Sequence, residues 1–178
     1  IAGGNYELAS EWLSVLGKTI DLDYESSGSL LRLLPLIAIT GRPLPSPFNK
    51  GQATDVWSGL SDNFTREDKE KRASRLLVLL SAMGIDPKLG AWKNIISANN
   101  LYLYEKIPST ALRYQLHDAA KNNRIAEVVC ISLIMLGSEG PSKSGLVALN
   151  AVIRALRQVE LESDARKIAI EAAILYVN

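Results

Sequence analysis

Residues 141–178 read PSKSGLVALNAVIRALRQVELESDARKIAIEAAILYVN, and their apolar residues recur in two series at helical spacing. The first series ends at Leu156 and the second begins at Ala165, with the short break 159–161 between them. Apolar residues three and four positions apart line one face of an α-helix. Two such segments predict an αα-hairpin, in which one amphipathic helix folds back on the other.

The same period continues towards the N-terminus. Thr65 to Met83 is predicted to be a helix, because Thr65 with Asp68 fits an N-terminal cap and Gly84 fits a C-terminal glycine. Three further helices are predicted at Asn5–Gly17, Ala53–Leu60 and from Pro87 onward, and a fourth begins after Pro108-Ser109 and ends at Asn122-Asn123.

The segment Ile125–Leu136 fits two structures. The part Val128–Leu136 is rich in β-branched residues, as in a buried strand, but no partner strands are visible, so a helix is preferred. Cys130, the only cysteine, lies in this apolar run and is predicted to be an inert core thiol.

The N-terminal region is less regular. Alternating apolar and acidic residues predict an extended segment at Ile20–Glu25, and the sequence SSGS at 26–29 predicts a break. The stretch 30–40 is apolar on nearly all sides, so we expect it to be buried, and Pro35 indicates a kink or a helix start near it. Three prolines predict a rigid connector at 41–52.

Three glycines, Gly41, Gly84 and Gly137, each follow an apolar stretch, and a proline comes within two to four residues of each. They lie 43 and 53 residues apart, which is too irregular for the period of about 40–47 residues in helical repeats but supports stacked helix pairs. The helical segments together predict an all-α fold of about seven to nine helices, packed as sequential antiparallel helical hairpins with the superhelical character of an α-solenoid.

The 178 residues are predicted to form a single helical module. A subdivision into 1–62, with its proline-rich connector, and the more regular 63–178 is the alternative. The sequence begins at Ile1 instead of methionine, which predicts a processed or trimmed fragment of a longer chain. Neither this start nor the single cysteine indicates the compartment.

Two stretches carry a resemblance to known proteins. They are Ala151-Val152-Ile153-Arg154-Ala155-Leu156-Arg157 and Ala165-Arg166-Lys167-Ile168-Ala169-Ile170-Glu171-Ala172. Together they resemble the C-terminal helical region of uncharacterised bacterial all-α proteins of the tetratricopeptide-like kind. The resemblance covers the last 55 residues, from Arg124 onward. It implies a superhelical region and brings no known catalytic residue.

Composition excludes several classes of partner. The 20 basic and 19 acidic residues leave a formal charge of only +1, too little to attract nucleic acid or an anionic membrane. The longest apolar runs, 33–40 and 128–136, are far shorter than the roughly 20 residues of a membrane-spanning helix. Apolar residues make up 47%, which is ordinary for a folded domain with a core.

The loop Gly137–Ser144, GSEGPSKS, is the one candidate phosphate site. Lys143 and Ser144 stand before a helix, as in phosphate-binding loops. However, Ser142 replaces the second glycine, and Pro141 has no N–H for the backbone cradle. A plain inter-helix loop with Ser142 or Ser144 as N-cap is therefore favoured, with nucleotide binding as the alternative.

Asp21, Asp23 and Glu25 have the spacing that begins a calcium loop. Ser26 and Arg32 stand where that loop requires glycine and glutamate, so we expect a solvated edge and no metal site.

The sole histidine, His117, is predicted to be a surface residue, because neither zinc partners nor a facing acid accompany it. The charged run Arg66–Arg75 is predicted to be a solvated helix face. No catalytic residue, metal or cofactor is predicted.

Aromatic residues supply the candidate binding surface. Trp57 and Trp92 lie near apolar helical positions, so core packing is favoured and a protein-binding surface is the alternative. Tyr102 and Tyr104 alternate with leucines in a predicted connector, where amphipathic aromatic side chains suit protein recognition.

The sequence therefore predicts a non-catalytic protein–protein interaction or scaffold module of a larger bacterial protein, with a protein or peptide partner. One alternative is a nucleotide- or phosphate-binding protein that uses Gly137–Ser144. A second is a structural domain for oligomerisation, including homo-oligomers, or for anchoring.

Overall fold

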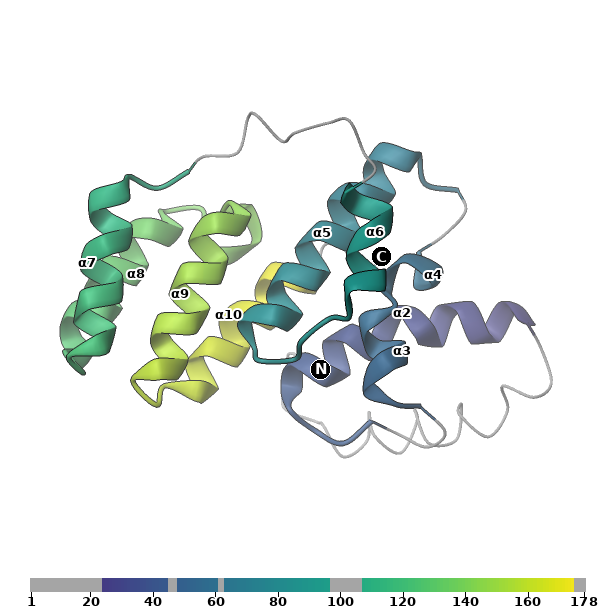
Figure 1. The fold of residues 1–178 in the computed structure, drawn as a ribbon, viewed down its shortest axis with the longest axis horizontal. Helices are drawn as coiled ribbons and strands as arrows, with labels where there is room; N and C mark the ends of the chain where they lie inside the picture. The colour runs from purple at the N-terminus through teal and green to yellow at the C-terminus, as the bar shows by residue number, and fades with distance from the viewer. Residues whose placement is uncertain (1–23, 45–47, 61–62, 97–106, 175–178) are drawn as a thin grey trace.

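The computed structural model describes residues 24–44, 48–60, 63–96 and 107–174 (Figure 1). Within these ranges every regular element is helical, so the predicted all-α fold is confirmed. The elements are α2 (Tyr24–Thr40), α3 (Lys50–Thr54), α4 (Val56–Gly59), α5 (Arg66–Ala82), α6 (Leu89–Ile96), α7 (Thr110–Lys121), α8 (Ile125–Leu136), the short 3₁₀ helix η2 (Pro141–Lys143), α9 (Leu146–Gln158) and α10 (Glu162–Ile174).

Several helices begin and end where the sequence predicts. The Thr65 hydroxyl accepts a hydrogen bond from the Asp68 N–H (3.1 Å), and the Ser109 hydroxyl accepts one from the Leu112 N–H (3.2 Å). The choice between helix and strand for the apolar segment before Gly137 is also settled, because α8 is a helix. The helix predicted at Asn5–Gly17 lies outside the described residues.

Three predictions for the N-terminal region were wrong. The extended segment predicted at Ile20–Glu25 is helical where it is described, because Tyr24 and Glu25 begin α2. The sequence SSGS at 26–29 does not break the chain but lies inside α2, and α2 continues through Pro35. Leu34 and Ile39 of this helix are fully buried, and such packing outweighs the weak helix propensity of serine and glycine. The predicted connector 41–52 ends early, because Asn49 caps α3.

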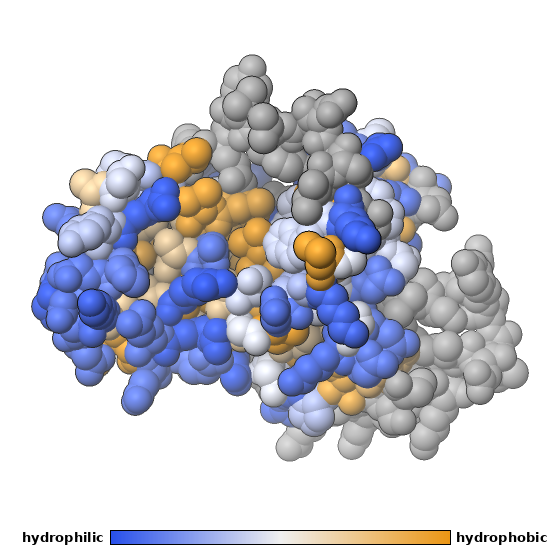
Figure 2. Space-filling view, in the orientation of Figure 1, coloured by the Kyte–Doolittle hydropathy of each residue, from blue (hydrophilic) through white to orange (hydrophobic). Residues whose placement is uncertain are grey.

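The α9–α10 hairpin lies between the α7–α8 pair and α5 (Figure 1). Helix α9 contacts α5 on one side and α7 and α8 on the other, while α10 contacts α5 and α2. The helices therefore do not pack in their order along the chain, and the sequential solenoid arrangement is not confirmed. On the face shown in Figure 2, apolar surface gathers between α9 and α5.

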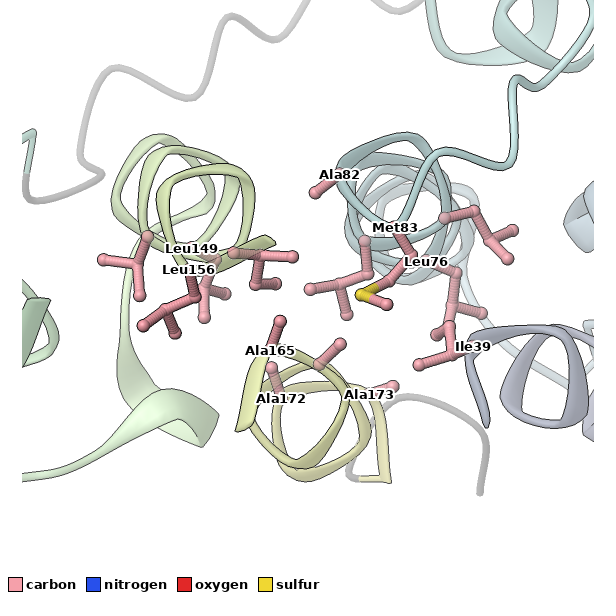
Figure 3. Packing of buried hydrophobic residues seen from close by; sticks show 14 of the residues in the cluster. Ile39, Leu76, Ala82, Met83, Leu149, Leu156, Ala165, Ala172 and Ala173 are labelled. Carbon is pink, nitrogen blue, oxygen red and sulfur yellow. The ribbon is translucent and has the colours of Figure 1, made fainter. Parts of the chain in front are cut away.

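The core lies where α9, α10, α5 and α2 meet (Figure 3). Helix α10 contributes small side chains, with Ala165, Ala169, Ala172 and Ala173 fully buried. Small residues at a contact let helix axes approach closely. The larger buried side chains come from its neighbours, among them Ile39, Leu76, Leu77, Leu79, Leu80, Met83, Leu149, Val152, Ile153 and Leu156.

Arg75 is a buried arginine, although the charged run 66–75 predicts a solvated face. Its side chain extends from α5 into the loop before α9 and to the end of α10. Nε donates to the carbonyl of Ala172 (2.9 Å), and Nη1 donates to that of Ser144 (3.1 Å). Nη2 donates to the carbonyls of Pro141 (2.8 Å) and Ser142 (3.1 Å). The prediction was wrong because α10 and the loop cover this part of α5.

Two arginines cover the glycines at the ends of α2 and α5. Gly41 and Gly84 have φ angles of +75° and +77°, which favour glycine. The guanidinium of Arg166 lies against Gly41, and that of Arg157 lies against Gly84 and donates to the last carbonyl of α5 (2.8 Å). Glu162 accepts from both, at 2.9 Å from Arg157 and 3.1 Å from Arg166. One carboxylate therefore links the two helix ends.

Ser144 has a different role from the predicted one. Gly145 is the N-cap of α9, without a side-chain cap. The Ser144 hydroxyl instead lies within 2.8 Å of the carbonyls of both Leu136 and Gly140. It thereby closes the loop on itself.

Replacing Arg75 with methionine keeps an apolar stem but removes the guanidinium donors that bond to the four carbonyls. Because buried carbonyls without partners are costly, we expect the free energy of unfolding to fall by about 3–5 kcal/mol. Lys71→Met on the same helix removes an exposed pair with Glu67 and should cost about 0.5 kcal/mol. Urea unfolding followed by circular dichroism compares the two, and equal losses would contradict the role given to Arg75.

Gly84→Ala places a side chain at positive φ and within 2.9 Å of the Arg157 guanidinium. We expect the free energy of unfolding to fall by about 1–2 kcal/mol. Gly90→Ala is the matched control, because Gly90 lies inside α6 with no atom within 4 Å of an added Cβ. It should raise the same quantity by about 0.5–1 kcal/mol. If both substitutions shift the urea midpoint in the same direction, the role given to the positive φ of Gly84 and its contact with Arg157 is wrong.

Candidate functional site

The predicted surface aromatics fall into two groups. Trp57 on α4 and Trp92 on α6 are half-buried and pack against the apolar core. Tyr102 and Tyr104 lie outside the described residues. Core packing, which the sequence favours for the two tryptophans, is thus what the structure gives them.

The loop Gly137–Ser144 directs its polar groups inward. The carbonyls of Pro141, Ser142 and Ser144 accept from Arg75. The backbone N–H groups of Gly140, Lys143 and Ser144 donate to carbonyls of the same loop at 3.3–3.4 Å. A phosphate cradle requires N–H groups that converge on a ligand, so this geometry does not favour nucleotide binding, which stays a prediction.

The outer face of α8 is apolar and open to solvent. One side of the helix packs on α7 and α9, and burial there includes Val128 and Ile131. On the other side Leu133 is 65% exposed and Ile134 is 63% exposed. We call this face the α8 stripe; it consists of Ile125, Ala126, Val129, Cys130, Leu133 and Ile134, all exposed.

Cys130 belongs to this stripe, and its prediction as a core thiol was wrong, because it is exposed. The sequence of α8 is apolar all round, so its pattern does not distinguish the face that packs from the face that does not. No sequence signal identifies the stripe, because the missing neighbour is a property of the packing order.

A pair of charge contacts fixes α8 against α7. Arg124, in the turn between them, donates from Nη2 to Asp118 and from Nε to Glu127, each at 2.6 Å. The hydrogen bond from Arg124 is the main cause that lowers the pKa of Asp118, and the bonds to Glu127 and Asp118 raise the pKa of Arg124. The turn residue Asn123 adopts a φ of +54°. These contacts set the orientation in which the stripe is presented.

A second feature is a shallow groove beside α9, which we call the basic groove. It consists of two adjacent hollows that share Arg154. One, of about 260 Å³, lies between α9 and the end of α5 and is lined by Ser81, Ala82, Gly84, Asp86, Arg154 and Arg157. The other, of about 140 Å³, lies between α9 and α7 and is lined by Arg113, Leu116, His117, Ala120, Ala151, Arg154, Ala155 and Gln158.

His117 is exposed, as predicted, but the structure places it in this groove with Arg113 and Arg154. The three residues come from positions on α7 and α9 that are far apart in the chain. Sequence reasoning missed their association, because nothing in the pattern of either helix indicates that α7 and α9 pack together.

The described ranges contain no group of three or more histidine, cysteine, aspartate or glutamate side chains placed to hold a metal ion. None of the helices in these ranges has the length and apolar character required to cross a membrane.

Comparisons with protein-family models, curated proteins and solved structures find no match for this chain. The resemblance of its C-terminal region to tetratricopeptide-like proteins therefore stays a prediction.

Arg124→Met tests the contact that orients α8. Its removal should raise the pKa of Asp118 towards the ordinary value of about 3.9, whereas Lys121→Met, which removes a weaker influence, should raise it less. Because the pKa of Asp118 is lowered in the folded state, its contact with Arg124 stabilises the folded protein at pH values above the ordinary aspartate pKa. This stabilisation is lost as the pH falls through the lowered pKa. NMR titration of the Asp118 carboxyl carbon measures the shift. An unchanged pKa in Arg124→Met would refute the assignment.

Proposed function

We propose that this chain is a non-catalytic protein-binding module whose partner packs an apolar helix face on the α8 stripe. The observation that carries the proposal is the continuous exposure of six uncharged residues along α8. In stacked helical proteins an outermost helix normally has a polar outer face for solubility. Helix α8 departs from that rule, and large exposed apolar patches typically mark interaction sites.

The energetics support an apolar partner. Burying one leucine or isoleucine side chain contributes about 1.5–3 kcal/mol. Leu133 and Ile134 are both more than half exposed, and Ile125 and Val129 extend the same face by two turns. Most of the available binding energy therefore lies in residues at helical spacing, which is the arrangement that an amphipathic partner helix uses.

The chemistry of the stripe argues against other partners. It carries no charge to contact a phosphate backbone or an anionic lipid surface. The nearest charged groups, Arg124 and Glu127, already pair with each other at the start of α8. A protein surface is the partner class that matches an uncharged face of one helix width.

Self-association is a second candidate, favoured by the same lack of charge. Two copies related by a two-fold axis would bring each stripe residue near its own counterpart. No like charges would meet, so the surface is compatible with a homodimer as well as with a foreign helix. This candidate corresponds to the predicted oligomerisation domain.

Leu133→Glu tests both candidates. A glutamate in the middle of the stripe would have to be buried on binding, so partners captured from a cell lysate should be lost, with affinity reduced at least about tenfold. Leu89→Glu is the matched control. Leu89 lies on α6, away from the stripe, and is 72% exposed, so the substitution makes the same chemical change at another exposed leucine. Capture by wild type and Leu89→Glu but not by Leu133→Glu is the expected result.

Light scattering over a concentration series separates the two candidates. A mass that doubles with concentration for wild type and Leu89→Glu but not for Leu133→Glu assigns the stripe to a homodimer. If Leu133→Glu captures the same proteins as wild type and has the same mass at every concentration, the stripe is not a binding site.

A further inference from the structure

The basic groove presents cations that the rest of the structure does not neutralise. Within the described ranges, no acidic side chain forms an ion pair or a hydrogen bond with Arg113 or Arg154. The Arg154 guanidinium is held by neutral groups instead. Nε donates to the Asn150 side chain (3.0 Å), and Nη2 donates to the Ser81 hydroxyl (3.3 Å).

These bonds keep Arg154 in place across the groove. Its Nη2 contact joins α9 to α5, and its side chain borders both hollows. An arginine that is fixed by neutral partners keeps its full charge and further N–H donors for a carboxylate. The position is therefore organised before any ligand arrives.

We propose that the basic groove binds an acidic peptide segment of a partner protein. Carboxylates of the segment would pair with Arg154 and Arg113, and an apolar side chain between them would cover the floor made by Leu116, Ala120 and Ala151. A peptide with two carboxylates on either side of an apolar residue would match a groove whose apolar floor is bordered by arginines.

The other charges of the groove do not cancel this preference. Arg157 is already paired with Glu162 at 2.9 Å, so it contributes little net charge. Asp86 lines the hollow near the end of α5 and opposes an acidic ligand there. The segment should therefore place its carboxylates towards α7, where Arg113 forms no ion pair with any acidic side chain in the described ranges.

A peptide fits the groove better than a nucleic acid does. Among the described residues, no phenylalanine, tyrosine or tryptophan lines either hollow, so the large aromatic platforms typical of single-strand binding are missing there. The formal charge of the whole chain is +1, which gives no long-range attraction for a polyanion. The cations are local and the floor is apolar, which suits a short segment with mixed side chains.

This inference extends the proposed function to a second surface and shares with it only the class of partner. The groove residues lie on α5, α7 and α9, and none of them belongs to the α8 stripe. Variants of the two surfaces therefore report on the two proposals separately.

Selection from a library of random dodecamer peptides tests the groove. Wild type should enrich peptides that contain several aspartate or glutamate residues. The double variant Arg113→Glu/Arg154→Glu should lose these peptides, with at least about tenfold weaker binding in fluorescence polarisation, and should select basic peptides instead. The control Lys93→Glu/Lys167→Glu makes the same charge change at exposed lysines outside the groove and should retain wild-type selection.

Circular dichroism and thermal unfolding establish that each variant is folded. The inference is overturned if wild type enriches no acidic peptides, if the groove variant binds them as wild type does, or if an oligo(dT) competitor displaces them at lower concentration than the free peptide. If Leu133→Glu abolishes peptide binding while the groove variant retains it, only the groove fails. If the groove variant loses peptide binding and Leu133→Glu has no effect in any assay, only the proposal for the α8 stripe is refuted.

Discussion

The guanidinium of Arg75 connects three parts of the chain that are far apart in sequence. It donates to four carbonyls, three in the loop before α9 and one near the end of α10. Because a buried carbonyl without a donor costs about 1–3 kcal/mol, this side chain stabilises the loop against the rest of the fold. The loop in turn joins the α7–α8 pair to α9. Arg75 thus links α5 and α10 to the loop through which the α7–α8 pair continues into α9.

Much of the local structure was predictable from the sequence. The caps at Thr65 and Ser109, and the apolar periods of α9 and α10, depend on residues a few positions apart, which a sequence displays directly. The order of packing was not predictable, because it depends on which apolar faces match in three dimensions. The role of Arg75 was hidden for the same reason. In the charged run 66–75, Glu70 and Arg75 are both buried, and only tertiary contacts distinguish them from the exposed members.

For the candidate surfaces too, local burial was predictable from the sequence, whereas features that depend on helix packing were not. Trp57 and Trp92 pack against the core, as their apolar surroundings indicate. The α8 stripe and the basic groove arise from a missing neighbour and from the meeting of α7 with α9, respectively. Neither has a local signature. Cys130 illustrates the difference, since an apolar context in the chain predicted burial and the packing left it exposed.

The position of the α9–α10 hairpin has a consequence for synthesis. This hairpin occupies the middle of the helical packing, yet it follows the other described helices in the chain. During translation, α2 and α5 leave the ribosome before the helices that cover their apolar faces. Nascent chains thus expose this surface until the hairpin emerges, and transiently exposed apolar surface of this kind favours aggregation. The core is then completed when the translated α9–α10 hairpin packs against α2 and α5.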